Sequence, residues 1–180
     1  MTTTSWFPVA DHFDVIARHV ARTALHGHEL VVWRADDGHV NVWENRCLHR
    51  GVRLSIGVND GAELVCRYHA WRYANRSGGC TYIPAHPADS PARTTTCATF
   101  PAAERDGLVW ASLDAADAES EPPQLDLPDE PFILRSRPAG ASADVVTAVL
   151  RETSWLPFGG HGDDVTTMRT IVPGCVSITV

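Results

Sequence analysis

The chain has 180 residues, of which 44% are hydrophobic and 21% charged, a balance that is ordinary for a globular protein. Its formal net charge of −7 argues against a nucleic-acid binder, which would usually carry a basic stripe. No apolar run is long enough to span a bilayer, and residues 1–10 do not resemble a signal peptide, so we expect a cytoplasmic protein with no membrane partner. Thiols stay reduced in that compartment, so the five cysteines indicate metal ligands or buried thiols before they indicate disulfides.

The chain up to about residue 113 has the pattern of short strands. Residues 11–24 are expected to hold a short helix or a turn. Residues 29–34 and 39–44 flank Asp-Asp-Gly, which predicts an antiparallel hairpin. Further strands are expected at residues 63–66, 71–74, 80–83, 94–99 and 108–113.

The composition changes after this point. Residues 114–140 are dominated by Ala, Asp, Glu and Pro, which is typical of an extended linker. Residues 141–180 regain apolar character, with strands expected at 145–150 and 176–180, although the first could also be a helix. We therefore expect a first domain at 1–113, a linker at 114–140 and a C-terminal segment at 141–180.

Two short segments each offer one thiol and one imidazole. Residues 47–49 are Cys-Leu-His, and residues 66–69 are Cys-Arg-Tyr-His. A Rieske-type [2Fe–2S] cluster binds one iron through two thiolates and the other through two imidazoles, which raises its potential to about −150 to +300 mV, against about −400 mV for plant-type clusters. The predicted ligands of such a cluster are Cys47, His49, Cys66 and His69.

Two other interpretations of these four residues stay open. Zinc also takes two cysteines and two histidines in a tetrahedral site, so a structural zinc protein is an alternative. Common zinc modules, however, pair Cys with Cys and His with His along the sequence, and here the two types interleave. The residues could also be structural and bind no metal.

The flanking residues resemble the N-terminal domain of the Rieske non-heme iron oxygenases, a family of ring-hydroxylating and demethylating enzymes. Residues 44–51, Glu-Asn-Arg-Cys-Leu-His-Arg-Gly, resemble its first cluster loop, with Leu48 in place of Pro. Residues 66–73, Cys-Arg-Tyr-His-Ala-Trp-Arg-Tyr, resemble its second loop, with Ala70 in place of Gly. The resemblance covers about residues 6–113. Respiratory-chain Rieske proteins carry an additional cysteine in each loop, which these loops lack.

The resemblance implies an all-β fold, a small antiparallel sandwich or barrel with two cluster loops at one end. It implies a Rieske-type [2Fe–2S] cofactor and a role in passing single electrons from a reductase or ferredoxin to an oxygenase iron centre. The alternative is a subunit or truncated form of an oxygenase whose mononuclear iron lies on another chain. In that case residues 141–180 would hold at most the opening strands of the catalytic domain. The substrate and the oligomeric state, a homo-oligomer included, stay open.

Further expectations concern the remaining cysteines and the residues beside the predicted ligands. Cys80, Cys97 and Cys175 are expected to be buried thiols. Trp71 and Tyr73 are expected to pack against the second loop as a hydrophobic lid. The two arginines beside ligands, Arg50 and Arg67, either face an acidic partner or are solvated surface residues.

The other histidines show no metal-like pattern. His161 lies near Asp163 and Asp164, but no second histidine follows at the spacing of a two-histidine, one-carboxylate iron site, so we do not expect iron there. The rest are expected at the surface or in the core: His12, His19, His26, His28, His39 and His86.

Overall fold

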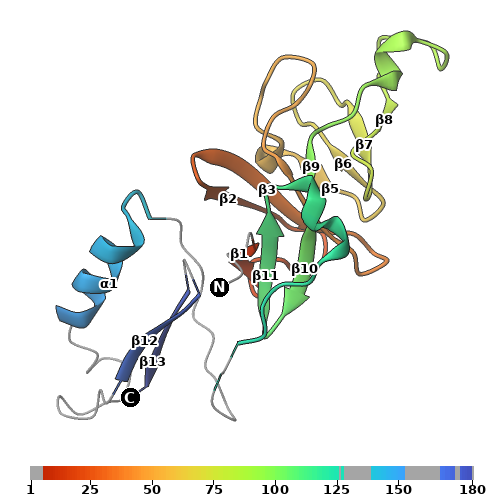
Figure 1. The fold of residues 1–180 in the computed structure, drawn as a ribbon. Coiled ribbons are helices and arrows are strands. Elements are labelled where there is room, and N and C mark those ends of the chain that lie inside the picture. Colours follow the sequence, from red (N-terminus) through yellow and green to blue (C-terminus); the bar gives the residue numbers. More distant parts are fainter. Residues whose placement is uncertain (1–5, 126, 128–138, 153–166, 173–174, 180) are drawn as a thin grey trace.

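The computed structural model describes residues 6–125, 127, 139–152, 167–172 and 175–179. Within them, three antiparallel sheets make up the main body of the molecule (Figure 1). The first sheet has the order β1 (Trp6–Asp11), β11 (Leu108–Ser112), β10 (Ala102–Arg105). The second has the order β2 (Val20–Leu25), β3 (His28–Arg34), β4 (Val40–Glu44), β9 (Thr99–Phe100). The third has the order β5 (Val58–Asn59), β6 (Glu63–Val65), β7 (Arg72–Ala74), β8 (Cys80–Tyr82).

Helical structure is limited in the described part of the chain. Three short 3₁₀ helices connect the strands: η1 (Leu54–Ile56), η2 (Pro91–Thr94) and η3 (Ala115–Glu119). The α-helix α1 (Ala143–Glu152) and the hairpin of β12 (Thr167–Val172) and β13 (Cys175–Thr179) follow them. None of the described helices is long and apolar enough to cross a membrane. The expected all-β, antiparallel fold is confirmed.

The strand β3 explains why the second sheet is the middle layer. Residues 30–33 form an uninterrupted apolar run, and successive side chains of a strand point to opposite faces. Val31 and Trp33 belong to the hydrophobic core shared with the third sheet, whereas Leu30 and Val32 belong to the core shared with the first. The middle sheet is therefore buried on both faces, and the third sheet is held on it by a continuous core.

Most of the expected strands are present. The predicted hairpin is formed by β3 and β4, and Gly38 in its turn has a φ of +85°, a left-handed conformation that favours glycine. The strands expected from residues 63, 71, 80, 108 and 176 occur as β6, β7, β8, β11 and β13. Of the two alternatives for residues 145–150, the helix is correct.

One expectation for local structure was met in part and another was wrong. Residues 11–24 hold turns up to Arg18, as expected, but β2 then begins at Val20 because it pairs with β3 along its whole length. Residues 94–99 are not one strand. Their backbone bonds first to the third sheet, at Gly78 and Cys80, and then to Glu44 of β4, so this segment crosses from one sheet to the next.

The beginning of the expected linker packs on the first sheet. The carboxylate of Asp114 accepts a hydrogen bond from the backbone N–H of Ala116 (2.9 Å) and so caps η3. The indole N–H of Trp6 donates to the hydroxyl of Ser120 (2.8 Å). Leu125 is buried in a small core with Trp6 and residues of β11. The first part of the expected linker, to Leu125, therefore lies against the first sheet.

Candidate metal centre

The two predicted cluster loops have the same backbone geometry. The first loop, residues 47–52, follows β4, and the second, residues 66–71, joins β6 to β7. In each loop the cysteine N–H donates to the carbonyl five residues later, and the cysteine carbonyl accepts from the N–H four residues later. The four bonds are Cys47 to Val52 (2.8 Å), Gly51 to Cys47 (2.8 Å), Cys66 to Trp71 (2.8 Å) and Ala70 to Cys66 (3.0 Å).

This closure places the fifth residue of each loop in the left-handed region. Gly51 has a φ of +69° and Ala70 a φ of +54°. Glycine adopts this conformation readily, whereas an alanine there costs about 1–2 kcal/mol because its Cβ crowds the backbone. Ala70 therefore holds the same turn as Gly51 at a conformational cost.

The four predicted ligands come together as two pairs of like residues. The side chains of Cys47 and Cys66 are each 2% exposed and share a hydrogen bond. The exposed rings of His49 and His69 lie with their centroids 4.6 Å apart. Among the described residues, no three Cys, His, Asp or Glu side chains are grouped as ligands of a single metal ion. A thiol pair inside and an imidazole pair outside is the arrangement that two irons with different ligands require.

Hydrogen bonds favour the thiolate form of Cys47, which is the form that binds metals. The bond from Cys66 lowers the pKa of Cys47 to about 5, with smaller contributions from Tyr73 and from the backbone amides of His49 and Arg50. The same bond between the two thiols, together with burial, raises the pKa of Cys66. One negative charge is therefore already stabilised at the buried pair.

Tyr73 of β7 reaches across to the first loop. Its hydroxyl lies 3.1 Å from Sγ of Cys47 and accepts a hydrogen bond from the backbone N–H of Leu48 (3.3 Å). Because that N–H uses the oxygen as acceptor, the phenolic proton is free to point at the sulfur. Burial, and then the bond to Cys47, raise the pKa of Tyr73, so it remains a neutral donor.

Aromatic side chains also support the histidines. The Trp71 ring stacks on His49, with centroids 4.9 Å apart and an interplanar angle of 6°. The Tyr68 ring lies 3.8 Å from that of His69, tilted by 39°. Trp71 and Tyr73 were expected to pack against the second loop as a hydrophobic lid; their stacking and hydrogen-bond contacts are instead with His49 and Cys47, proposed ligands of the first loop. The two loops are thereby tied together.

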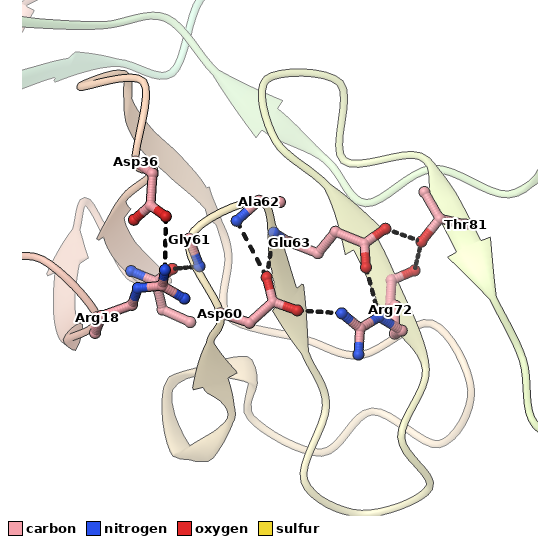
Figure 2. Close-up of polar contacts among 9 residues, drawn as sticks. Arg18, Asp36, Asp60, Gly61, Ala62, Glu63, Arg72 and Thr81 are labelled. Atoms are coloured by element: carbon pink, nitrogen blue, oxygen red, sulfur yellow. Dashed lines mark hydrogen bonds and ion pairs between the residues drawn. The ribbon is translucent and has the colours of Figure 1, made fainter.

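An ion-pair network that sequence reasoning missed fixes the strands below the second loop. Arg72, the residue after that loop, binds the carboxylates of both Asp60 and Glu63, as Figure 2 shows. The hydroxyl of Thr81 donates to the other oxygen of Glu63 (2.5 Å). These bonds join β6, β7 and β8. The opposite charges become neighbours only through the strand register, which the sequence did not reveal.

The turn between β5 and β6 rests on the middle sheet. The backbone N–H of Asp36 donates to the carbonyl of Gly61 (2.8 Å), and the Asp36 carboxylate pairs with Arg18 (2.6 Å), as Figure 2 also shows. Gly61 has a φ of +93°, and a Cβ there would lie 2.2 Å from the Asp36 carboxylate. This position therefore requires glycine for both conformation and space.

The other residues discussed from the sequence do not join the site. Cys80 and Cys97 are buried, as expected, and burial raises the pKa of Cys97 to about 12. Arg50 and Arg67 are exposed. Among the described residues, the histidines outside the loops are exposed, apart from the half-buried His39. Four residues discussed from the sequence have side chains that the structure does not describe: Cys175, His161, Asp163 and Asp164.

Comparisons with known proteins agree with this geometry. Residues 5–101 match the family model of the Rieske [2Fe-2S] domain. Among curated proteins, the chain is 42% identical over 153 residues to Oxidoreductase NdmD of Pseudomonas putida, covering 82% of this chain and 26% of that protein. It is 30% identical to Methylxanthine N1-demethylase NdmA of the same organism, covering 70% of this chain and 37% of that protein.

Solved structures show the same likeness. NdmA of Pseudomonas putida CBB5 superposes with a TM-score of 0.61 at 29% identity, over 69% of this chain and 39% of that one. Apo Dicamba Monooxygenase superposes with a TM-score of 0.58 at 27% identity, over 66% of this chain and 37% of that one. The chain thus spans about a quarter to two fifths of these relatives. It belongs to the Rieske [2Fe–2S] domain family, its relatives include Rieske non-heme iron oxygenases, and its cofactor is a Rieske-type [2Fe–2S] cluster.

Proposed function

We propose that this chain is an electron-transfer module, in which the cluster ligands are Cys47, His49, Cys66 and His69. The observation that carries the proposal is the sorting of these ligands into a buried thiol pair and an exposed imidazole pair. When bound, the cluster supplies a centre that accepts and releases one electron.

The protein provides two different environments for that centre. The core around Cys47 and Cys66 excludes water, and Tyr73 holds a hydrogen-bond donor at one sulfur. The rings of His49 and His69 are exposed, so their outer N–H groups can hydrogen-bond to a partner. Electrons therefore enter and leave through the imidazole edges, where a partner can approach most closely.

The proposed donor is a reductase or ferredoxin, and the proposed acceptor is an oxygenase iron centre. The acceptor is supported by the names of relatives, which include a methylxanthine N1-demethylase and the oxygenase subunit of 3-chlorobenzoate-3,4-dioxygenase from Comamonas testosteroni. The relative with 42% identity is named an oxidoreductase and not an oxygenase. A Rieske domain of this kind is thus also found in a protein that is not named for oxygenation.

A second candidate function is that of one part of a Rieske oxygenase. It is favoured by the solved oxygenase structures, of which this chain covers 28 to 39%. In this case residues 1–113 form the Rieske domain, residues 114–140 the connection, and residues 141–180, with α1 and the β12–β13 hairpin, the start of a catalytic region. The mononuclear iron would then lie on another chain or segment.

Metal and electron counting distinguishes these functions. The purified chain is expected to contain two irons and two acid-labile sulfides and to take up one electron per molecule in a redox titration. A third iron together with O₂-dependent product formation would support the oxygenase candidate instead. One zinc ion and no visible absorbance would contradict both.

A further inference from the structure

The arginines of this chain are unevenly paired. Most of those whose side chains are described bind a carboxylate: Arg18, Arg22, Arg34, Arg53, Arg72, Arg76 and Arg105. Among the described side chains, the guanidinium groups of Arg46, Arg50 and Arg67 have neither an ion pair nor a hydrogen bond. All three side chains are exposed. Three positive charges are therefore uncompensated.

These three arginines all lie beside proposed cluster ligands. Arg46 precedes Cys47, Arg50 follows His49, and Arg67 follows Cys66. Residues 45–59 and 64–76 contain no Asp or Glu, although the whole chain has a net charge of −7. Because the rings of His49 and His69 lie close together, the loops bring the three charges to one end of the molecule. That end is locally positive on an acidic protein.

The same end exposes two large apolar side chains. Leu48 in the first loop is 42% exposed and Tyr68 in the second is 56% exposed. Each is the immediate sequence neighbour of a histidine ligand. Exposed apolar side chains together with arginines are the composition of a protein-binding surface, where tyrosine and arginine contribute much of the affinity.

We propose that the loop-end surface, formed by Arg46, Leu48, Arg50, Arg67 and Tyr68, docks the acidic face of an electron-carrier protein. Carboxylates of the partner pair with the three guanidinium groups, and its apolar centre covers Leu48 and Tyr68. The inference rests on the proposed function and adds the chemistry of the partner. Charge complementarity supports this occupant, because no carboxylate of the described part of the chain pairs with these guanidinium groups and carboxylates match their geometry.

The rate of electron transfer from an acidic carrier tests the proposal. The probe is a plant-type [2Fe–2S] ferredoxin, whose low potential makes transfer to a Rieske centre favourable. Stopped-flow mixing with the full, cluster-loaded chain gives the second-order rate constant at increasing ionic strength. Two acidic proteins that meet at random would repel, so their rate constant would rise with salt. The loop-end surface predicts the opposite, a rate constant that falls with salt.

Two triple variants separate local charge from net charge. Arg46→Gln, Arg50→Gln and Arg67→Gln together should lower the rate constant at low ionic strength at least about tenfold and abolish its fall with salt. The matched control, Arg18→Gln, Arg76→Gln and Arg105→Gln, removes the same charge from outside both loops and should leave the rate within about twofold. The salt dependence reports charge rather than driving force, so a changed cluster potential cannot mimic the result.

The possible outcomes are distinct. A rate constant that rises or stays constant with salt in the wild type, or an equal loss in both triple variants, overturns the docking surface. Salt-sensitive self-association of the wild type that the first triple variant abolishes would assign the surface to a second copy and also overturn it. If that triple variant holds no cluster, Arg50→Gln and Arg67→Gln measured singly should each weaken the salt dependence. A wild type without a reducible cluster would refute the proposed function instead.

Discussion

At the scale of single residues, Tyr73 provides a direct test of how the protein tunes the cluster. Its hydroxyl lies 3.1 Å from Sγ of Cys47, and a hydrogen bond to sulfur stabilises the negative charge added on reduction. Tyr73→Phe should retain the cluster but lower its reduction potential by about 20–65 mV, which corresponds to one hydrogen bond of about 0.5–1.5 kcal/mol. Redox titration followed by visible absorbance measures this change.

Tyr82 offers the matched control for that substitution. It lies on β8 with an exposed ring, outside both cluster loops. Tyr82→Phe should leave the potential unchanged. An unchanged potential in Tyr73→Phe, or equal shifts in both variants, would show that the hydroxyl of Tyr73 does not act on the sulfur.

Ala70 offers a test of backbone strain in the second loop. Its φ of +54° is costly for alanine and not for glycine. Ala70→Gly should therefore raise the free energy of unfolding by about 1 kcal/mol, measured by denaturant titration of the cluster-loaded chain. Ala98→Gly is the control, because Ala98 is exposed and is not among the described residues with positive φ, so glycine there should destabilise. A loss of stability in Ala70→Gly would contradict this account.

The proposed ligands are visible in the sequence, whereas the contacts around them could not be predicted. Interleaved Cys and His at short spacing follow from the chemistry of a cluster with two unlike irons, which leaves a local signal. The hydrogen bond from Tyr73 to Cys47 joins residues 26 positions apart and depends on how β7 packs under the first loop. The significance of Arg46 was also missed, because it becomes visible only when most of the described arginines outside the two loops are seen to be paired.

At the scale of secondary-structure elements, the Arg72 network makes the third sheet dependent on ion pairs. The side chains of Arg72, Asp60 and Glu63 are 21 to 35% exposed, so water and salt screen these ion pairs less than they screen fully exposed ones. Arg72→Gln would leave the carboxylates of Asp60 and Glu63 close together without a cation. The unfolding free energy should fall by about 1–2 kcal/mol.

A more exposed ion pair provides the control for this variant. Arg76 and Asp37 are 60% and 45% exposed, so Arg76→Gln should lower the unfolding free energy clearly less than Arg72→Gln in the same denaturant titration. Equal losses in the two variants would mean that the network adds nothing beyond an ordinary surface pair.

The turn between β3 and β4 gives the protein a pH dependence outside the cluster. Burial lowers the pKa of His39, the Arg76 guanidinium lowers it further, and Asp37 opposes them. The folded state therefore binds fewer protons here than the unfolded state. The resulting stability is present above the unfolded pKa of about 6.5 and is lost as pH falls toward the folded value.

His39→Gln isolates this contribution from that of other groups. Between about pH 7 and pH 5, the variant should lose less unfolding free energy than the wild type. Denaturant titrations at several pH values in this range measure the difference. Parallel losses in the two proteins would exclude His39 as the source.

Short-range patterns also explain which elements could be predicted. The hairpin of β3 and β4 combines β-branched residues with an Asp-Gly turn, and both signals are local. By contrast, β2 and β10 contain Ala and Arg, which have no strong preference for strands, and they form because neighbouring strands pair with them. Likewise, residues 94–99 cross between two sheets, which no local pattern announces.

At the scale of the whole molecule, the three stacked sheets position the cluster loops. The middle sheet is buried on both faces and supports the third sheet, from which the second loop extends. Tyr73 and Trp71 then connect that loop to the first. The cysteines are consequently held inside a rigid core while the histidines remain at the surface. The proposed electron-transfer function rests on this separation rather than on the identity of the four residues alone.

The central claim is that Cys47 and Cys66 bind one iron and His49 and His69 the other. Pulsed EPR of the reduced, cluster-loaded chain counts the nitrogens that coordinate the cluster directly. We expect two nitrogen couplings in the wild type and one in His49→Cys or His69→Cys, together with a lower potential in each variant. A wild-type spectrum without directly coordinated nitrogen, or variants that keep both couplings, would contradict the assignment.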